Sequence, residues 1–202
     1  MLASKDRPAK PQHLLYLHGF RSSPRSAKAQ RMARWVSSQG RDLSWHCPQL
    51  PPSPAEAMAL IEGLIQAIPA GSLAVMGSSL GGFYASCVAQ RRADARVVLL
   101  NPAVDPARDL ARHIGEHSCW QTPEERFFFR AEYVEELRAL QHGPHTAPQR
   151  LLAVIAKGDE VLDWREMQAH HQDSHIKLLE GSDHGLSDFD DYLHELVEFL
   201  QL

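Results

Sequence analysis

The stretch Ser72-Leu73-Ala74-Val75-Met76-Gly77-Ser78-Ser79-Leu80-Gly81-Gly82 decides the fold of this chain. A short apolar run ends in the pattern G-x-S-x-G centred on Ser79, and a helical pattern of small residues follows at once. A serine at a sharp strand-to-helix turn needs glycine two residues away on either side, because larger side chains would collide there. Gly77 and Gly81 meet this requirement. The pattern predicts a buried strand, a turn that exposes the Ser79 hydroxyl, and a helix whose Leu80 N–H faces a developing oxyanion.

Apolar runs alternate with helical patterns on both sides of this turn. The runs are short and largely continuous, which is typical of parallel strands that are buried on both faces of a sheet. They cover residues 14–17, 43–47, 73–76, 97–100, 151–156 and 176–179. Helical patterns separate them and begin near residues 24, 54, 80, 163 and 188. We therefore predict an α/β protein with about six parallel strands flanked by helices.

The alternation of strand and helix stops between residues 103 and 149. This segment has no strand pattern and contains two helical patterns, one over residues 106–117 and one over residues 123–141. A chain of 202 residues has the length of one α/β domain. We therefore predict a single domain over residues 1–202, in which residues 103–149 form a helical cap insertion.

Composition and charge argue against several classes of protein. The net charge of -4 provides no overall basic field, so nucleic acid is not indicated as a partner. Residues 1–12 lack the apolar core of a secretory signal, and the longest apolar run, residues 151–156, is too short to span a bilayer. Three widely spaced cysteines, Cys47, Cys87 and Cys119, are typical of reduced thiols. We therefore expect a cytoplasmic protein.

Two further polar residues lie where a serine nucleophile needs them. Such a serine requires a base that takes its proton and an acid that orients the base. Asp159 follows the predicted strand 151–156 after only two residues, and His184 follows the last predicted strand. The order serine, aspartate, histidine along the chain is the order found in α/β-hydrolases. We predict that Ser79, Asp159 and His184 form a catalytic triad.

Three other aspartates compete with Asp159 for the role of the acid. Asp163 begins the capping pattern Asp163-Trp164-Arg165-Glu166, so it already has a structural task at a helix start. Asp183 is next to His184 in sequence, and neighbours on an extended loop point apart. Asp105 precedes a proline, which indicates the beginning of a helix.

The segment His18-Gly19-Phe20 ends the first predicted strand and lies where an oxyanion loop would be needed. We expect the Phe20 N–H to be the second oxyanion donor beside the Leu80 N–H. One such donor typically stabilises the transition state by about 3 kcal/mol. His18 is interpreted as a structural residue that shapes this loop through a ring hydrogen bond, and not as a second catalytic histidine.

Several blocks of this sequence resemble the small bacterial YqiA-type esterases. They are residues 16–20, 22–24, 26–28, 77–82, 84, 100–104, 158–163 and 182–184, so the resemblance covers nearly the whole chain. It implies a compact α/β-hydrolase that cleaves carboxylic esters or thioesters, with Ser79, Asp159 and His184 as the triad and no metal or cofactor. It also implies Phe20 and Leu80 as oxyanion donors. Because residues before 13 leave no room for extra strands, the first strand should lie between the second and the third.

Three alternatives stay open at this point: a peptidase with the same triad, a metal-dependent hydrolase, and an inactive binding module on this fold. The metal alternative rests on His113-Ile114-Gly115-Glu116-His117, which matches H-x-x-E-H. Its glycine weakens the helix that this motif requires. His170, His171 and His175 are interpreted as an exposed helix end and strand start. We therefore expect no metal.

The nature of the substrate is left open by two further features. A basic series, Arg21, Arg25, Lys28, Arg31 and Arg34, begins beside the predicted oxyanion loop. It is either a solvated helix face or a docking surface for an anionic substrate, such as the phosphates of an acyl-coenzyme A. The aromatic residues 127–129 and 133 either pack the cap onto the body or line an acyl pocket. The expected partner is a small-molecule acyl ester or thioester, and the sequence does not determine acyl-chain length or oligomeric state.

Overall fold

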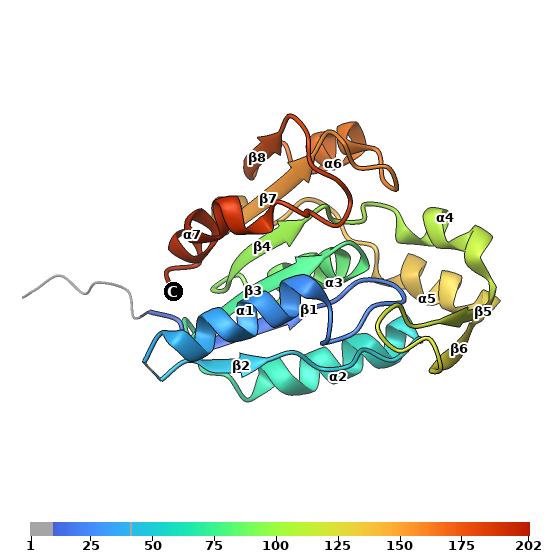
Figure 1. Ribbon diagram of the computed structural model, residues 1–202, viewed down its shortest axis with the longest axis horizontal. Helices are drawn as coiled ribbons and strands as arrows, with labels where there is room; N and C mark the ends of the chain where they lie inside the picture. The colour runs from blue at the N-terminus through green and yellow to red at the C-terminus, as the bar shows by residue number, and fades with distance from the viewer. Residues whose placement is uncertain (1–9, 41) are drawn as a thin grey trace, which may run out of the picture.

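The computed structural model describes residues 10–40 and 42–202, which form a parallel sheet between layers of helices (Figure 1). The sheet has six strands in the order β2-β1-β3-β4-β7-β8. These are β1 (His13–Leu17), β2 (Ser44–His46), β3 (Leu73–Ser78), β4 (Arg96–Leu100), β7 (Leu151–Ala156) and β8 (His175–Leu179). The six predicted strands are confirmed, and so is the position of the first strand between the second and the third.

Helices cover both faces of this sheet, which explains why the strands are apolar along their whole length. They are α1 (Ala27–Ser38), α2 (Pro54–Gln66), α3 (Leu80–Arg91), α4 (Pro106–Leu110), α5 (Ala131–Leu140), α6 (Trp164–His170) and α7 (Phe189–Phe199). Leu14 and Tyr16 of β1 pack with α1 and α7, whereas Leu15 and Leu17 pack with α2 and α3. Alternate residues of one strand thus enter two separate cores. No helix in the described part of the chain is long and apolar enough to cross a bilayer.

The carboxyl ends of the parallel strands meet at one edge of the sheet. β3 lies near the centre, where Gly77 is paired with Leu17 of β1 on one side and with Leu99 of β4 on the other. The loops that follow β1, β3, β7 and β8 all leave the sheet from this edge. Figure 1 shows residues 103–149 at the end toward which the strand arrows point.

The internal structure of residues 103–149 differs from the prediction. The helices α4 and α5 are present, but β5 (Gly115–Ser118) and β6 (Arg126–Phe129) form an antiparallel hairpin. The helices predicted over 106–117 and 123–141 are therefore wrong where the chain forms β5 and β6. Gly115 has a φ of 144°, which a helix does not allow. Phe128 is 56% exposed and Phe129 only 1%, so this aromatic run follows the period of a strand and not of a helix.

Candidate active site

Ser79 occupies the turn between β3 and α3 in a strained backbone conformation. Its φ of 57° and ψ of -120° lie outside the favourable regions, at a typical cost of about 1–3 kcal/mol. The surrounding hydrogen bonds hold it there. The Ser79 N–H donates to Leu100 O at 2.9 Å, and the Ser79 carbonyl accepts from the Gly82 and Ala103 N–H groups at 2.9 and 3.1 Å. The backbone of β4 and α3 thus presents the serine at the edge of the sheet.

The two glycines of the motif are required by close backbone contacts. A Cβ atom at Gly77 would lie 2.2 Å from the Gly81 carbonyl oxygen. A Cβ atom at Gly81 would lie 2.0 Å from the Leu17 carbonyl oxygen. These neighbours belong to the backbone of α3 and β1 and cannot move aside. The steric requirement predicted from the sequence is confirmed.

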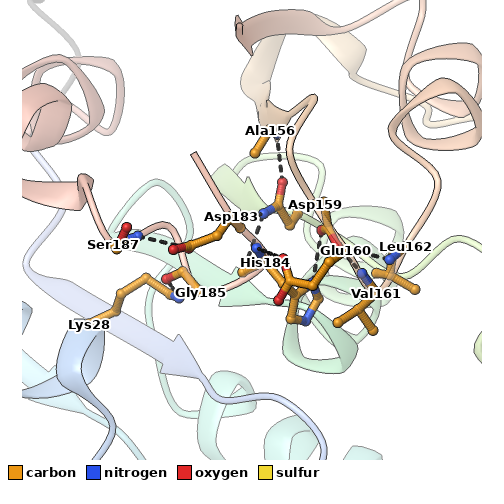
Figure 2. A network of polar contacts seen from close by, with 11 residues as sticks. Lys28, Ala156, Asp159, Glu160, Val161, Leu162, Asp183, His184, Gly185 and Ser187 are labelled. Atoms are coloured by element: carbon orange, nitrogen blue, oxygen red, sulfur yellow. Dashed lines mark hydrogen bonds and ion pairs between the residues drawn. The ribbon is translucent and has the colours of Figure 1, made fainter. Parts of the chain in front are cut away.

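His184 and Asp159 form an ion-pair geometry at the same edge of the sheet (Figure 2). Nδ1 of His184 lies 2.8 Å from Oδ2 of Asp159. The other carboxylate oxygen of Asp159 accepts the N–H groups of Val161 and Leu162, both at 2.8 Å. The Asp159 side chain is 0% exposed and that of His184 is 21% exposed. The buried carboxylate therefore fixes Nδ1–H as the donor and leaves Nε2 of His184 with a free lone pair.

The loops that carry the acid and the histidine are packed tightly on each other. A Cβ atom at Gly158 would lie 2.1 Å from the Ser182 carbonyl oxygen, so only glycine permits this approach. Oε2 of Glu160 accepts the His184 N–H at 3.0 Å. These contacts keep His184 close to Asp159 although 25 residues separate them.

Asn101, which the sequence analysis did not single out, joins these loops to the sheet. It is 0% exposed and has a positive φ of 41°, which asparagine tolerates better than most residues. Its Nδ2 donates to the carbonyls of Asp183 and His184 at 3.0 and 3.2 Å. Its Oδ1 accepts the Ala156 N–H at 2.8 Å. The signal in the sequence is an asparagine directly after a buried strand and before a proline.

His18 shapes the loop after β1, as predicted. It is 4% exposed, its Nε2 accepts the Leu50 N–H at 3.0 Å, and its Nδ1 donates to the Gly19 carbonyl at 3.0 Å. Burial lowers the pKa of His18 below its ordinary value. A neutral imidazole in one tautomer satisfies both contacts. His18 therefore directs the Gly19 carbonyl and leaves the next N–H, that of Phe20, available.

The backbone of this loop lies against Ser79. A Cβ atom at Gly19 would lie 3.2 Å from Cβ of Ser79. In residues 10–40 and 42–202, neither the Phe20 N–H nor the Leu80 N–H donates to a protein acceptor. Two unpaired N–H groups beside a serine hydroxyl are suited to bind a developing oxyanion.

A cavity of about 370 Å³ opens beside the serine. Residues of the sheet edge and of the 103–149 insertion share its walls, among them Phe20, Ser79, Leu80, Leu110, Trp120 and His184. Among the described residues, no hydrogen bond joins Ser79 to His184; in structures without substrate this contact is often longer than in the reacting complex. Ser79 and His184 nevertheless face one space that is large enough for a small acyl group.

The aromatic residues of the insertion pack it onto the body, as one of the two interpretations predicted, and none of residues 127–129 and 133 lines the cavity beside Ser79. The ring of Phe129 packs on that of Phe20, with their centroids 5.3 Å apart. Phe127 also contacts Phe20, with ring centroids 5.8 Å apart, and lines a second cavity of about 360 Å³ beside the loop after β1. The hairpin β5–β6 is therefore held to the body by its rings, and one of these rings also faces a cavity.

The basic series is divided between the solvent and the cavity. Arg25 and Arg34 are exposed, and Arg31 forms an ion pair with Asp190. Arg21 lies over the Trp120 ring at 3.8 Å and lines the cavity. Lys28 also lines the cavity, where its amino group donates to the Gly185 carbonyl, and burial lowers its pKa to about 8. Neither interpretation of the series holds for all its members.

The competing aspartates have other tasks in the structure. Asp163 caps α6 by accepting the Arg165 N–H at 2.9 Å, as predicted, but Glu166 binds Arg108 instead of reaching back to the cap. Asp183 accepts the Ser187 N–H at 3.0 Å. Asp105 likewise caps α4, as the following proline indicated.

The H-x-x-E-H motif does not form the helical arrangement that it requires. His113 ends a short 3₁₀ segment, Ala111–His113, and His117 lies in β5. Nε2 of His117 contacts the His113 carbonyl at 2.6 Å, so this nitrogen is engaged by backbone. The interpretation of His171 as exposed is wrong, because this side chain is 2% exposed. The reason is a neighbouring loop, residues 141–147, that the sequence pattern could not place.

The six-stranded parallel sheet with helices on both faces, and with a serine at the turn after its central strand, defines an α/β-hydrolase fold. The sequence matches the family described as "Uncharacterised protein family (UPF0227)" over residues 13–201, and the chain belongs to this family. The family match and the structural neighbours confirm the resemblance to YqiA-type esterases.

Similar solved structures share this fold at low sequence identity. A putative hydrolase from Agrobacterium vitis S4 superposes with a TM-score of 0.71 at 18% identity, over 95% of this chain and 91% of that chain. Est1E from Butyrivibrio proteoclasticus, with ferulic acid bound, gives 0.72 at 15% identity, over 96% and 89%. A monoacylglycerol lipase from Paleococcus ferrophilus gives 0.67 at 16% identity, over 95% of each chain.

Proposed function

We propose that this protein is a serine hydrolase that cleaves carboxylic esters or thioesters through an acyl-enzyme. One observation carries the proposal: a serine held at a strained turn faces the same cavity as a histidine that is paired at 2.8 Å with a buried carboxylate. A histidine with a purely structural role would not need to face a cavity, and a serine in an ordinary turn would not need a strained backbone. Ser79, His184 and Asp159 then have the roles of nucleophile, base and orienting acid.

The reaction follows from these positions. Ser79 Oγ attacks the carbonyl carbon of the substrate while Nε2 of His184 takes the hydroxyl proton. The oxyanion that forms accepts the N–H groups of Phe20 and Leu80. His184 returns its proton to the leaving group, and a water molecule then releases the acyl group by the same route. Asp159 keeps Nδ1 protonated and stabilises the charged imidazole.

The walls of the cavity support the proposal of a small-molecule acyl substrate. Leu110 and Trp120 supply apolar surface, while Arg21 and Lys28 supply positive charge. We assign to residues 103–149 the role of a cap over a single domain that spans the chain. Three free thiols, Cys47, Cys87 and Cys119, support a cytoplasmic location. The ester and lipid hydrolases among the structural neighbours support ester cleavage in preference to a peptidase or a binding module.

A fluorophosphonate probe tests the proposal, because it labels only an activated serine. Mass spectrometry of the labelled protein should place the adduct on Ser79, and Ser78→Ala should be labelled as wild type. A panel of acyl esters and thioesters of increasing chain length, with peptide amides alongside, then defines the substrate class. Cleavage of peptides alone would favour the peptidase, and complete inertness without labelling would favour the binding module.

A further inference from the structure

A second group of histidines lies outside the cavity of Ser79. His145, in the loop that follows α5, and His170 and His171, at the end of α6, have potential ligand nitrogens that all lie within 4.8 Å of one another. The rings of His170 and His171 are 4.8 Å apart, and those of His145 and His171 are 5.8 Å apart. His142 adjoins the group, with its ring 5.1 Å from that of His145. Two segments that are distant in sequence thus bring their imidazoles together.

Two nitrogens of this group are buried without a hydrogen-bond partner in the described chain, namely Nδ1 of His145 and Nδ1 of His171. His171 is 2% exposed, so water does not readily reach this atom. An unsatisfied buried polar atom typically costs about 1–3 kcal/mol and calls for an explanation, of which a bound ion is one. One ligand bound by both histidines would give each of these two nitrogens a partner.

The group consists of imidazoles alone, since no carboxylate or thiol of the described residues joins it. Only the neutral imidazole can donate a lone pair to a metal ion. Three neutral imidazoles without a carboxylate suit zinc and other first-row transition metals, whereas calcium and magnesium prefer oxygen ligands.

Two residues of α3, Ser86 and Gln90, form hydrogen bonds with His145 and with the loop that carries it. Oγ of Ser86 lies 3.0 Å from Nε2 of His145, so an Nε2–H that donates to this hydroxyl leaves the lone pair on Nδ1. Gln90 donates to the carbonyls of Gly143 and Pro144 at 3.0 and 2.8 Å and thereby holds the loop on α3. Hydrogen bonds that orient a histidine and select its tautomer are typical of metal sites.

We propose that His145, His170 and His171 bind one transition-metal ion of the zinc type at a structural site separate from the serine. Tetrahedral zinc with bonds of about 2.0–2.1 Å separates its ligand nitrogens by about 3.4 Å. The ligand nitrogens now lie up to 4.8 Å apart, so binding requires them to approach one another by up to about 1.4 Å. His142 is not counted among the ligands, because its Nε2 lies 3.0 Å from Ser86 Oγ and its Nδ1 lies 2.8 Å from the Gly143 carbonyl oxygen. The ion would join α6, which follows the Asp159 loop, to the loop after α5.

Zinc titration of tag-free, chelator-stripped protein tests this site independently of the proposed hydrolysis. Calorimetry should show one Zn²⁺ per chain with a Kd below about 1 µM, and saturating zinc should raise Tm by about 5–10 °C. His170→Ala is the informative variant because His170 is exposed and its loss should leave the fold intact. We expect it to weaken zinc binding by at least about 100-fold and to abolish the rise in Tm.

His194→Ala provides the matched control, since His194 is an exposed histidine on α7. It should bind zinc as wild type, and both variants should react with the fluorophosphonate probe at the wild-type rate. The proposal is overturned if the wild type binds no stoichiometric zinc. It is equally overturned if His170→Ala keeps wild-type affinity, or if His194→Ala loses as much affinity as His170→Ala.

Discussion

His184 and His171 have the same side chain but very different surroundings, and we propose different chemistry for each. His184 lies at a cavity wall with a buried carboxylate on Nδ1, so it can take a proton at Nε2 and keep the resulting charge stabilised. His171 is buried among other histidines and its Nδ1 has no partner in the described chain, so protonation there is unfavourable. If both proposals hold, the partner on the second ring nitrogen determines whether a histidine transfers protons or binds a metal ion.

The largest effect is expected from Ser79→Ala, which removes the proposed nucleophile beside His184. We expect kcat for esters to fall by about 10⁶, because no acyl-enzyme can form. The histidine group should be untouched, so zinc affinity should remain at the wild-type value. Steady-state kinetics and calorimetry on one preparation measure both. Unchanged esterase activity in a correctly folded Ser79→Ala protein would refute the assignment.

Asp159→Asn should lower kcat by about 10⁴, since the amide would hold His184 in the wrong tautomer. Asp163→Asn is the matched control. Asparagine can still accept the Arg165 N–H at the start of α6, so this variant should lose well under about 1 kcal/mol of unfolding free energy and keep a nearly normal kcat. Kinetics and thermal melts of both variants separate the roles. The opposite ranking in kcat would mean that the acid is Asp163.

Asn101→Asp should show how far the position of His184 depends on the loop that carries it. The substitution keeps an acceptor for the Ala156 N–H but loses the donors to the carbonyls of Asp183 and His184. Misplacement of a catalytic group by an ångström can cost about 100-fold, so we expect a loss of this size in kcat with little change in KM. A wild-type kcat in the folded variant would limit Asn101 to a structural role.

Removal of metal should distinguish the two regions directly. Exhaustive chelation should leave kcat within about twofold of its original value, because protein groups fill every role in the proposed mechanism. The same treatment should lower Tm by about 5–10 °C if zinc was bound at the histidine group. His113→Ala with His117→Ala should change neither quantity strongly. Activity lost in chelator and restored by zinc alone would instead favour a metal-dependent hydrolase.

The smallest effect concerns Lys28, which lies beside the cavity. Burial lowers the pKa of its amino group to about 8. Between about pH 8 and the ordinary lysine pKa near 10.5, the unfolded chain binds a proton that the folded protein has released. Stability of the wild type should therefore rise with pH in this window, by about 2 kcal/mol relative to Lys28→Met. Urea unfolding of both proteins at pH 7 and pH 10 measures the difference. Parallel pH profiles would show that the Lys28 charge is well solvated.

The sequence alone was sufficient for those features that depend on local pattern. Continuous apolar runs predicted the six strands, and glycine spacing predicted the turn at Ser79, because steric clashes between backbone atoms act over a few residues. The chain order of Ser79, Asp159 and His184 was informative because parallel strands end at one edge. These predictions needed no knowledge of which loops touch.

Only the tertiary structure decided the features that depend on contacts between distant segments. The β5–β6 hairpin replaced a predicted helix because Phe127 and Phe129 pack on Phe20, about a hundred residues earlier in the chain. His171 became buried because the loop of residues 141–147 covers it. Local pattern reports the preferences of a segment, whereas burial and the distance between two side chains depend on how the whole chain closes around them.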